Sequence, residues 1–172
     1  MGKIREISGD LLGIEQGIVV HGCNCQGAMG AGVALAVRQR RSAVFAAYQS
    51  LHKSQGLKLG QAQICVSIGD GRADWARKHG DAIVSIPAGL VFVNGMTQWS
   101  YGRDVRQVDY DAISAVFARV RLLARDTGMP VYFPLIGCGN AGGAWAEVAP
   151  RIEAALGDQV QAILVREAKG AV

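Results

Sequence analysis

The sequence predicts an α/β protein in which a central mixed, mostly parallel sheet lies between two layers of helices. Two observations lead to this prediction. Short apolar segments of strand length alternate along the chain with segments of helical periodicity, and two glycine-rich stretches each lie between a strand and a helix. Strands that alternate with helices form parallel or mixed sheets that are covered on both faces. We therefore expect a three-layer α/β/α sandwich.

The composition supports one domain over residues 1–172. Half of the residues are hydrophobic (50%) but only 6% are aromatic, so the interior must be built from small and aliphatic side chains. This composition excludes a disordered chain, a collagen and a coiled coil. No apolar run is long enough to span a bilayer, and the first ten residues lack the apolar core of a signal peptide. We expect a cytoplasmic protein without a membrane partner, whose four cysteines are reduced thiols.

The charge balance favours a small anionic ligand. The net charge is +4 and the isoelectric point is near 9.0. The basic residues are scattered, and the one dense stretch, 38–41, is predicted to be a solvated helix end rather than a nucleic-acid patch.

The first half of the chain contains two predicted strands and two predicted helices. Alternating apolar and polar residues predict a strand over 4–7, and a contiguous apolar run predicts a buried central strand over 17–20. Helical periodicity follows over 33–40. Ser42 is predicted to cap a second helix, with apolar positions that include Phe45 and Tyr48.

The middle of the chain contains further strands around a polar insertion. Ranges 62–68 and 90–96 are strand-like, and the segment 83–86 is predicted to pair with 90–93 across a short turn. The insertion over 69–80 is predicted to be a solvated surface excursion, with contact to a larger substrate as the alternative.

The last third contains the clearest helix, over 108–126, because Ile113, Val116 and Val120 fall on one stripe. Gly128 and Pro130 end this helix. The remaining elements are a strand over 131–136, a helix over 144–156 and a strand over 160–165.

The two glycine-rich loops are the strongest functional signal. Residues 22–32 have the sequence G-C-N-C-Q-G-A-M-G-A-G, and residues 137–143 have the sequence G-C-G-N-A-G-G. Loops in this position face the crevice at the carboxyl ends of strands, where glycine lets backbone N–H groups approach phosphate oxygens. We expect a diphosphate held from both sides; the alternative is that the glycines only form tight turns.

Familiar nucleotide motifs do not explain these loops. The second loop matches the dinucleotide-binding pattern, but only about thirty residues follow it, too few for the two halves of a dinucleotide fold. Neither loop has the Gly-Lys-Ser/Thr ending of a P-loop.

His21, Cys23 and Cys25 alternate, so their side chains are expected on one face of a strand. His21 is the best acid–base candidate because imidazole titrates near neutrality; the alternative is a core histidine. The cysteines are predicted to be buried thiols. A zinc site completed by Cys138 and a Cys–His nucleophile pair are the alternatives.

Asn24 and Asp10 each allow two interpretations. Asn24 can hydrogen-bond sugar hydroxyls or can support an unusual turn. Asp10 can accept a hydrogen bond from an adenine amino group or can cap the turn that follows it.

Three segments in order resemble a macrodomain, the ADP-ribose-binding fold, and the resemblance covers nearly the whole chain. They are I-S-G-D-L-L, V-V-H-G-C-N-C-Q-G-A-M-G-A-G-V-A and P-L-I-G-C-G-N-A-G-G-A-W. Within that family they are most similar to the branch that contains the yeast ADP-ribose 1″-phosphate phosphatase, the human terminal ADP-ribose–protein glycohydrolase and small phage and bacterial proteins.

The resemblance implies a role for each matching position. Asp10 and Leu11 would bind the adenine, which Val165 and Arg166 would flank. The loop over 27–32 would hold the distal ribose with Asn24, and the second loop would wrap the diphosphate. Thr97 and the segment after it, up to Gly102, would line the other side. The implied ligand-binding residues are Asp10, Leu11, Asn24, Gly27, Met29, Gly30, Ala31, Gly32, Thr97, Gln98, Gly137, Cys138, Gly139, Asn140, Ala141, Gly142, Val165 and Arg166.

Two departures from the family bear on the reaction. The glycohydrolase uses a lysine where this chain has Gln98 and an aspartate where it has Ala141, and neither replacement can do that chemistry. We therefore expect a hydrolase that removes the terminal phosphate of ADP-ribose 1″-phosphate, with His21 and Asn24 as catalytic residues and without a metal or cofactor. The alternatives are a non-catalytic ADP-ribose reader and a lysine-independent hydrolase acting on ADP-ribosylated protein or nucleic acid.

Overall fold

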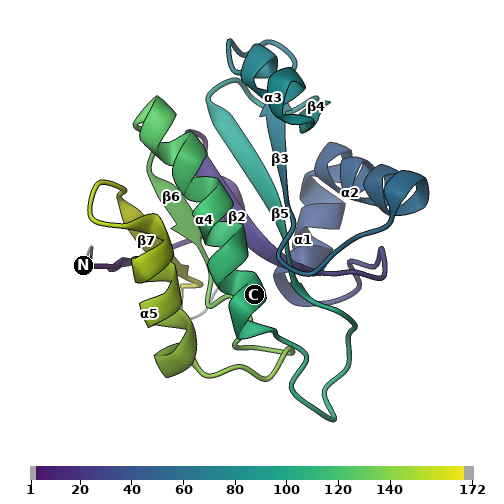
Figure 1. Cartoon of the computed structure of the whole chain (residues 1–172), viewed down its shortest axis with the longest axis vertical. Helices are drawn as coiled ribbons and strands as arrows, with labels where there is room; N and C mark the ends of the chain where they lie inside the picture. The colour runs from purple at the N-terminus through teal and green to yellow at the C-terminus, as the bar shows by residue number, and fades with distance from the viewer. Residues whose placement is uncertain (1–2, 169–172) are drawn as a thin grey trace.

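A seven-stranded sheet forms the centre of the protein in a computed structural model (Figure 1). The structure describes residues 3–168. The strands lie in the order β1-β7-β6-β2-β5-β3-β4. Their bounds are β1 Arg5–Ser8, β2 Gly17–Asn24, β3 Ala62–Ser67, β4 Ala82–Val84, β5 Leu90–Gln98, β6 Val131–Phe133 and β7 Ala162–Arg166. The helices are α1 Gly32–Arg40, α2 Ser42–Gln55, α3 Ala73–His79, α4 Tyr110–Thr127 and α5 Trp145–Leu156, and a 3-10 turn, η1, covers Leu11–Gly13.

The sheet is mixed and mostly parallel, as predicted. Strands β1, β7, β6, β2 and β5 all run in one direction. β3 pairs antiparallel with β5, and β4 pairs parallel with β3. β3 and β4 therefore run against the other five strands, at one edge of the sheet.

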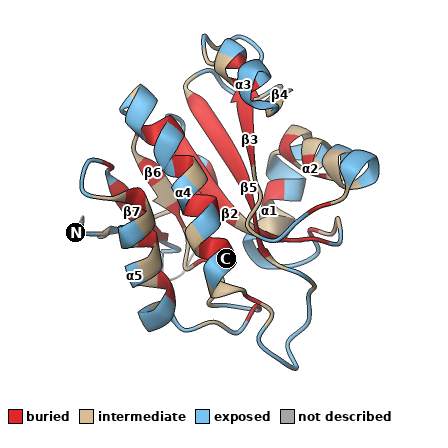
Figure 2. Ribbon diagram, in the orientation of Figure 1, coloured by how far each residue is buried: buried red, intermediate tan, exposed pale blue. Residues whose placement is uncertain are grey.

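Helices cover both faces of the sheet, which confirms the three-layer sandwich. One core lies between the sheet and helices α4 and α5, and the other lies between the sheet and helices α1 and α2. Central β2 supplies Ile18 and Val20 to the first core and Val19 and Cys23 to the second, as strand alternation requires. Figure 2 shows the buried central strands between half-exposed helices.

Helix α4 follows its sequence signals closely. Its buried positions include the predicted stripe of Ile113, Val116 and Val120. The Asp109 side chain caps it by accepting a hydrogen bond from Ala112 N at 2.9 Å, and Gly128 ends it in the left-handed conformation with φ of 69°.

Two local predictions are wrong, and a third is incomplete. Ser42 is the first residue of α2 rather than its cap; Arg41 occupies the cap position and no side chain bonds there. The segment around β4 pairs with β3 and not with residues 90–93, because β2 and β3 already occupy both edges of β5. The insertion over 69–80 is mostly exposed, as predicted, but it contains α3, whose Ala73 and Ala76 are buried.

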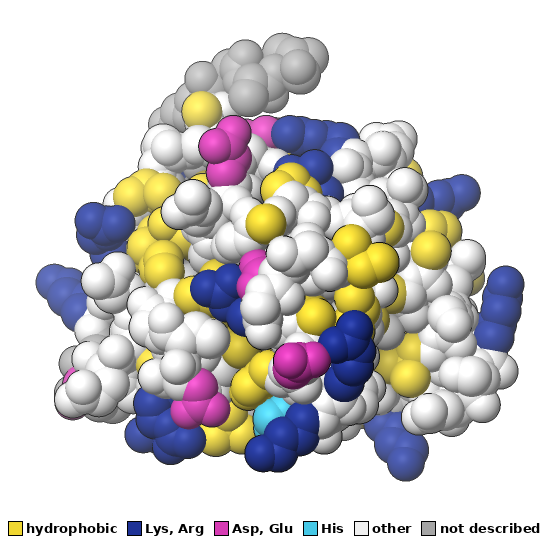
Figure 3. Space-filling view, turned by 90° about the horizontal axis from the view of Figure 1, so that it is seen from above, with side chains coloured by type: hydrophobic (Ala, Val, Ile, Leu, Met, Phe, Trp, Pro, Cys, Tyr) yellow, Lys and Arg dark blue, Asp and Glu magenta, His cyan; other side chains and the backbone are white. Residues whose placement is uncertain are grey.

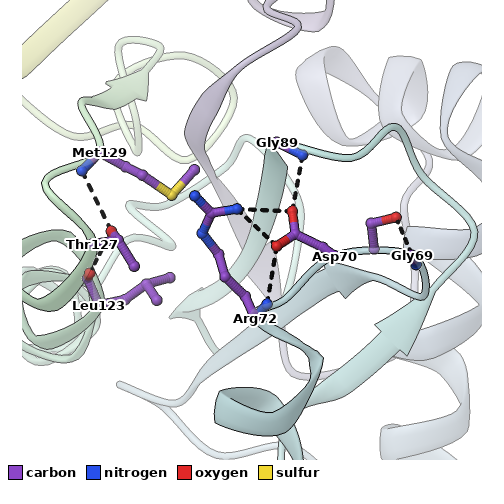
Figure 4. A network of polar contacts seen from close by, with 8 residues as sticks. Gly69, Asp70, Arg72, Gly89, Leu123, Thr127 and Met129 are labelled. Atoms are coloured by element: carbon purple, nitrogen blue, oxygen red, sulfur yellow. Dashed lines mark hydrogen bonds and ion pairs between the residues drawn. The ribbon is translucent and has the colours of Figure 1, made fainter.

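The insertion is fixed to helix α4 by packing and to the turn before β5 by a carboxylate. The guanidinium of Arg119 lies 5.1 Å from the centre of the Trp75 ring. Asp70 accepts hydrogen bonds from Arg72 N at 3.0 Å and Gly89 N at 2.9 Å, and it pairs with the Arg72 guanidinium (Figure 4). These contacts join the insertion to the turn that precedes β5.

The α3 end of the sheet lies opposite the carboxyl ends of the parallel strands (Figure 1). Figure 3 shows basic, acidic and apolar side chains interspersed on that face. The net positive charge therefore forms no continuous patch there. Within the described residues, no helix is both long and apolar enough to cross a membrane.

Candidate functional site

A cleft of about 740 Å³ opens where the chain leaves β2 and β6 in opposite directions. From β2 the chain passes through α1 and α2 to β3, beyond β5, whereas from β6 it passes through α5 to β7 on the other side. The helices of the two connections lie on opposite faces of the sheet. In open α/β sheets, ligands bind at such a switch point, outside the carboxyl ends of the strands.

Three segments line the cleft. The first glycine-rich loop and the start of α1 contribute residues 22–24, 28 and 30–34. The second loop contributes residues 134–137 and 139–141, and the segment after β5 contributes residues 98 and 101–103. The two glycine-rich loops thus face one cleft, as predicted.

Asn24 builds the first loop with its own side chain. Its Oδ1 accepts hydrogen bonds from Gln26 N at 2.9 Å and Ala28 N at 3.4 Å, and its Nδ2 donates to Ala28 O at 2.7 Å. The Tyr48 hydroxyl, from α2, donates to Asn24 O at 2.7 Å and to Oδ1 at 2.9 Å. Burial raises the pKa of Tyr48, so its hydroxyl stays a donor. These contacts support the turn-forming interpretation of Asn24, and its contact with ribose stays a prediction.

The first loop ends on helix α1 without a capping side chain. Gly27 turns the chain with a φ of 78°, and a β-carbon there would lie 2.5 Å from the His52 ring. Ala31 occupies the cap position of α1 and offers no side-chain acceptor. The first N–H groups of the helix, at the cleft wall, therefore offer hydrogen bonds and the positive end of the helix dipole to an anion.

The second loop leaves a row of backbone donors for a ligand. The N–H groups of Cys138, Gly142 and Gly143 bond to carbonyls within the loop. Across residues 3–168, the N–H groups of Gly139, Asn140 and Ala141 have no acceptor. All three of these residues line the cleft.

Gly143 closes the second loop on itself. A β-carbon at Gly143 would lie 2.5 Å from Gly137 O and 2.7 Å from a Val108 methyl group. The backbone of this loop can be compact only because glycine occupies this position.

His21 lies in the core and outside the cleft lining. It is fully buried, and its Nε2–H donates to Asn94 Oδ1 at 2.6 Å. Asn94 Nδ2 in turn donates to Gln63 Oε1 at 3.0 Å. Burial lowers the pKa of His21 to about 4, against the raising effect of the Asn94 hydrogen bond. A neutral core imidazole does not fit the predicted proton transfer to a bound substrate, and the alternative interpretation, a core histidine, agrees with the structure.

The cysteines are free thiols. Cys23 and Cys25 are buried, as predicted, and burial raises the pKa of Cys25 to about 11. Both belong to the core on the α1/α2 side, whereas Cys138 packs against the core on the α4/α5 side. The four groups of the alternative zinc site are therefore not brought together.

The predicted adenine-binding residues do not border the cleft. Asp10 caps η1 by accepting from Leu12 N at 3.0 Å and pairs with Arg40 at 2.8 Å; this Arg40 hydrogen bond lowers the pKa of Asp10. Arg166 pairs with Glu6, and Gly9 N donates to Arg166 O at 2.8 Å. The basic stretch 38–41 does end α1, although Arg40 is used in this ion pair. Contact of these residues with adenine stays a prediction.

The structure brings together half of the predicted site residues, and none of these was assigned to the adenine. Nine predicted residues line the cleft: Asn24, Gly30, Ala31, Gly32, Gln98, Gly137, Gly139, Asn140 and Ala141. The remainder lie outside the lining: Asp10, Leu11, Gly27, Met29, Thr97, Cys138, Gly142, Val165 and Arg166. Thr97 is fully buried beneath Gly22. A β-carbon added at Gly22 would lie 2.7 Å from the Thr97 hydroxyl oxygen.

Sequence reasoning missed several lining residues. Val33 and Ala34 were assigned only to the body of a helix, and residues 134–136 only to a strand. Arg103 follows the predicted segment directly. Its position one residue after Gly102, in the segment that follows β5, was the available signal.

The cleft contains few titratable side chains. Those in its lining are Cys23, Tyr101 and Arg103. Gln98 Nε2 donates to Ser100 O at 2.7 Å, and the Ala141 carbonyl accepts from Gln107 N at 2.8 Å. The positions of Gln98 and Ala141 in the lining confirm that the cleft lacks a lysine and an aspartate there.

The sheet order, the two glycine-rich loops and the cleft between them define a macrodomain fold. The chain aligns with the macrodomain of Mycobacterium tuberculosis DarG with a TM-score of 0.71 and 25% identity, covering 96% of this chain and 98% of that one. No protein-family model matches the chain.

Two curated relatives add similarity in sequence. An ADP-ribose 1″-phosphate phosphatase from Neosartorya fischeri is 47% identical over 49 residues, 28% of this chain and 24% of that protein. A DNA ADP-ribosyl glycohydrolase from Mycobacterium tuberculosis is 27% identical over 148 residues, 86% of this chain and 37% of that protein. The chain thus matches only about a quarter to somewhat over a third of these relatives' length.

Proposed function

We propose that the chain binds ADP-ribose in the cleft and hydrolyses the bond that joins C1″ of its distal ribose to a substituent. The observation that carries this proposal is the pair of anion-binding walls on one cleft. The uncapped start of α1 lies on one wall, and the free N–H groups of residues 139–141 lie on the other. Donors on both sides suit a diphosphate.

The cleft volume and lining fit a ligand of this kind. Its volume of about 740 Å³ falls within the range of about 300–1,000 Å³ that small-molecule sites occupy. With the diphosphate between the loops, the distal ribose extends towards Asn24 and Gln98. The C1″ substituent then leaves past Tyr101 and Arg103, which border the cleft on its third side.

The residues in the cleft support catalysis by orientation and by electrostatic stabilisation. The backbone N–H groups hold the charged diphosphate in a fixed position, and the amides of Asn140 and Gln98 can orient a water molecule at C1″. Water adds a hydroxyl group to C1″, and its proton goes to the leaving group.

Two substituents are candidates for the leaving group. The phosphate of ADP-ribose 1″-phosphate is supported by the short phosphatase similarity, but His21 is not in the cleft to move a proton. A nucleic acid is supported by the DNA ADP-ribosyl glycohydrolase, whose similarity extends over 86% of this chain. We favour the nucleic-acid substituent for this reason.

Calorimetry with ADP-ribose tests the binding step. A β-carbon at Gly139 would meet no atom within 4 Å, so Gly139→Glu places a charge in the cleft without a clash. We expect Gly139→Glu to weaken ADP-ribose binding at least tenfold through charge repulsion. The matched control is Gly69→Glu, which is also free of contacts and lies at the α3 end of the sheet, and it keeps the affinity.

A folded wild-type protein that does not bind ADP-ribose at millimolar concentration refutes the proposal. Turnover is then measured with ADP-ribose 1″-phosphate and with an ADP-ribosylated single-stranded oligonucleotide. Release from neither substrate, with ADP-ribose binding intact, makes the protein a reader and removes the hydrolase part of the proposal.

A further inference from the structure

The segment that joins β5 to α4 places aromatic side chains in water beside the cleft. We call residues 99–106 the ridge. Within it, Trp99 is 58% exposed and Tyr101 is 63% exposed. The backbone is fixed at Trp99, because Trp99 O accepts hydrogen bonds from Cys25 N and from Gln26 Nε2, both at 3.0 Å. Large exposed aromatic side chains on a fixed backbone are typical of binding surfaces.

The ridge separates the cleft from a second pocket. Tyr101 and Arg103 line the cleft, whereas Trp99 and Arg106 line the second pocket, which has a volume of about 480 Å³. The rest of its wall is formed by Leu59, by residues 107–109, by the first two residues of α4 and by Arg151 of α5. The cleft and this pocket therefore share the ridge as a wall.

The second pocket contains guanidinium groups held in place by an aromatic ring. The Arg106 guanidinium lies 4.6 Å from the centre of the Tyr110 ring, and that of Arg151 lies 5.0 Å from it. Arg151 also pairs with Glu147 at 3.0 Å. In the part of the chain that the structure describes, the side chains of Arg103 and Arg106 have no ion pair or hydrogen bond, so Arg106 is the unpaired guanidinium of the second pocket. An oriented, unpaired guanidinium is a good partner for a phosphate group.

The pocket also contains carboxylates. Asp109 uses its carboxylate to cap α4, whereas Asp111 is exposed. A free carboxylate can accept hydrogen bonds from the exocyclic amino group of a base. An unpaired arginine, a stacking surface and an acceptor for amino groups together match the three parts of a nucleotide.

We propose that the second pocket binds one nucleotide of a single-stranded nucleic acid, next to the nucleotide that carries the ADP-ribosyl group. Trp99 stacks on the base and Arg106 contacts the phosphodiester. The strand must be single because exposed aromatic side chains stack only on bases that are free of a duplex. This inference rests on the proposed function, since the ADP-ribosyl group occupies the cleft.

Fluorescence anisotropy with a fluorescein-labelled DNA 12-mer of mixed sequence, without modification, tests the pocket. We expect Trp99→Ala to weaken binding about 5- to 150-fold, because stacking on one aromatic side chain contributes that much. Trp99→Phe keeps a stacking ring and restores most of the affinity. Arg106→Ala lowers the slope of log affinity against log salt concentration by about 0.7, the value for one phosphate contact on a single strand.

Two variants at the opposite end of the sheet are matched controls. Ile68 is 73% exposed and Lys78 is exposed, so Ile68→Ala and Lys78→Ala remove an apolar and a basic side chain from another surface. Both should leave oligonucleotide binding unchanged. The same 12-mer as a duplex should bind more weakly than the single strand.

Several results overturn the inference. They are equal affinity for polyglutamate or for an unmodified peptide of the same length, equal affinity for the duplex, and full affinity in Trp99→Ala. Calorimetry with ADP-ribose on the same proteins separates this inference from the proposed function. If ADP-ribose binds but the oligonucleotide does not, only the second pocket is refuted; if the oligonucleotide binds through Trp99 but ADP-ribose does not, only the proposed function is refuted.

Discussion

His21 should make the stability of the protein fall steeply in mild acid. The imidazole is fully buried and neutral in the folded state, where burial lowers its pKa from 6.5 to about 4. In the unfolded chain the imidazole is in water and binds a proton near pH 6.5. Below that pH the unfolded state binds a proton that the folded state does not, so the unfolded state is favoured.

The size of this effect follows from the two pKa values. Each pH unit between 6.5 and 4 lowers the free energy of unfolding by about 1.4 kcal/mol, which gives about 3 kcal/mol in total. The loss begins as the pH falls through about 6.5 and is complete near pH 4. It is a large part of the roughly 5–15 kcal/mol that stabilises a typical protein.

Urea denaturation at pH 7.5 and pH 4.5 measures this contribution. We compare the wild type with His21→Gln, since the difference between them cancels the other titrating groups. At pH 7.5 the variant is less stable, because it disturbs the contact with Asn94; at pH 4.5 the wild type has lost about 2.5 kcal/mol more than the variant. A difference that does not change with pH would show that His21 titrates alike in both states and would refute the argument. Calorimetry should find ADP-ribose affinity at pH 7.5 unchanged in His21→Gln, because His21 lies outside the cleft lining.

Two further predictions concern the loops. Tyr48→Phe removes the hydroxyl that donates to Asn24 O and Oδ1. We expect the free energy of unfolding to fall by about 1–3 kcal/mol and the melting temperature in calorimetric scans to fall by about 2–10 °C. An unchanged melting temperature would contradict this role. Gly143→Ala places a β-carbon 2.5 Å from Gly137 O, so we expect the second loop to shift. The free energy of unfolding should fall by about 1–3 kcal/mol, and the affinity for ADP-ribose should fall at least tenfold. Gly69→Ala, with no atom in the way, is the control for Gly143→Ala, and equal ADP-ribose affinity in the two variants would sink the prediction.

Local patterns predicted the elements and the two loops well. The apolar stripe of α4 and the glycine sequences around the cleft are properties of short segments, and no distant contact alters them. Strand pairing depends on more of the chain. The partner of residues 83–86 could not be predicted because it depends on β2 and β3 occupying both edges of β5.

The roles of polar side chains were harder to predict for the same reason. The alternation of His21 and Cys23 correctly placed them on one face. That face packs into the core with α1 and α2, which leaves His21 fully buried and outside the cleft lining. Asn24 lines the cleft, as the sequence predicted, but its side-chain amide is already hydrogen-bonded to Tyr48 and to its own loop. Whether a polar group is free or engaged depends on residues far away in the sequence.

The two outermost strands of the sheet bear on self-association. β1 has four residues and β4 has three, and the exposed Arg5 and Glu6 place charge on the β1 edge. An edge strand can recruit another chain through its unpaired N–H and C=O groups, and short, charged edges offer few of them. The sheet is thus poorly suited to grow by strand addition at either edge.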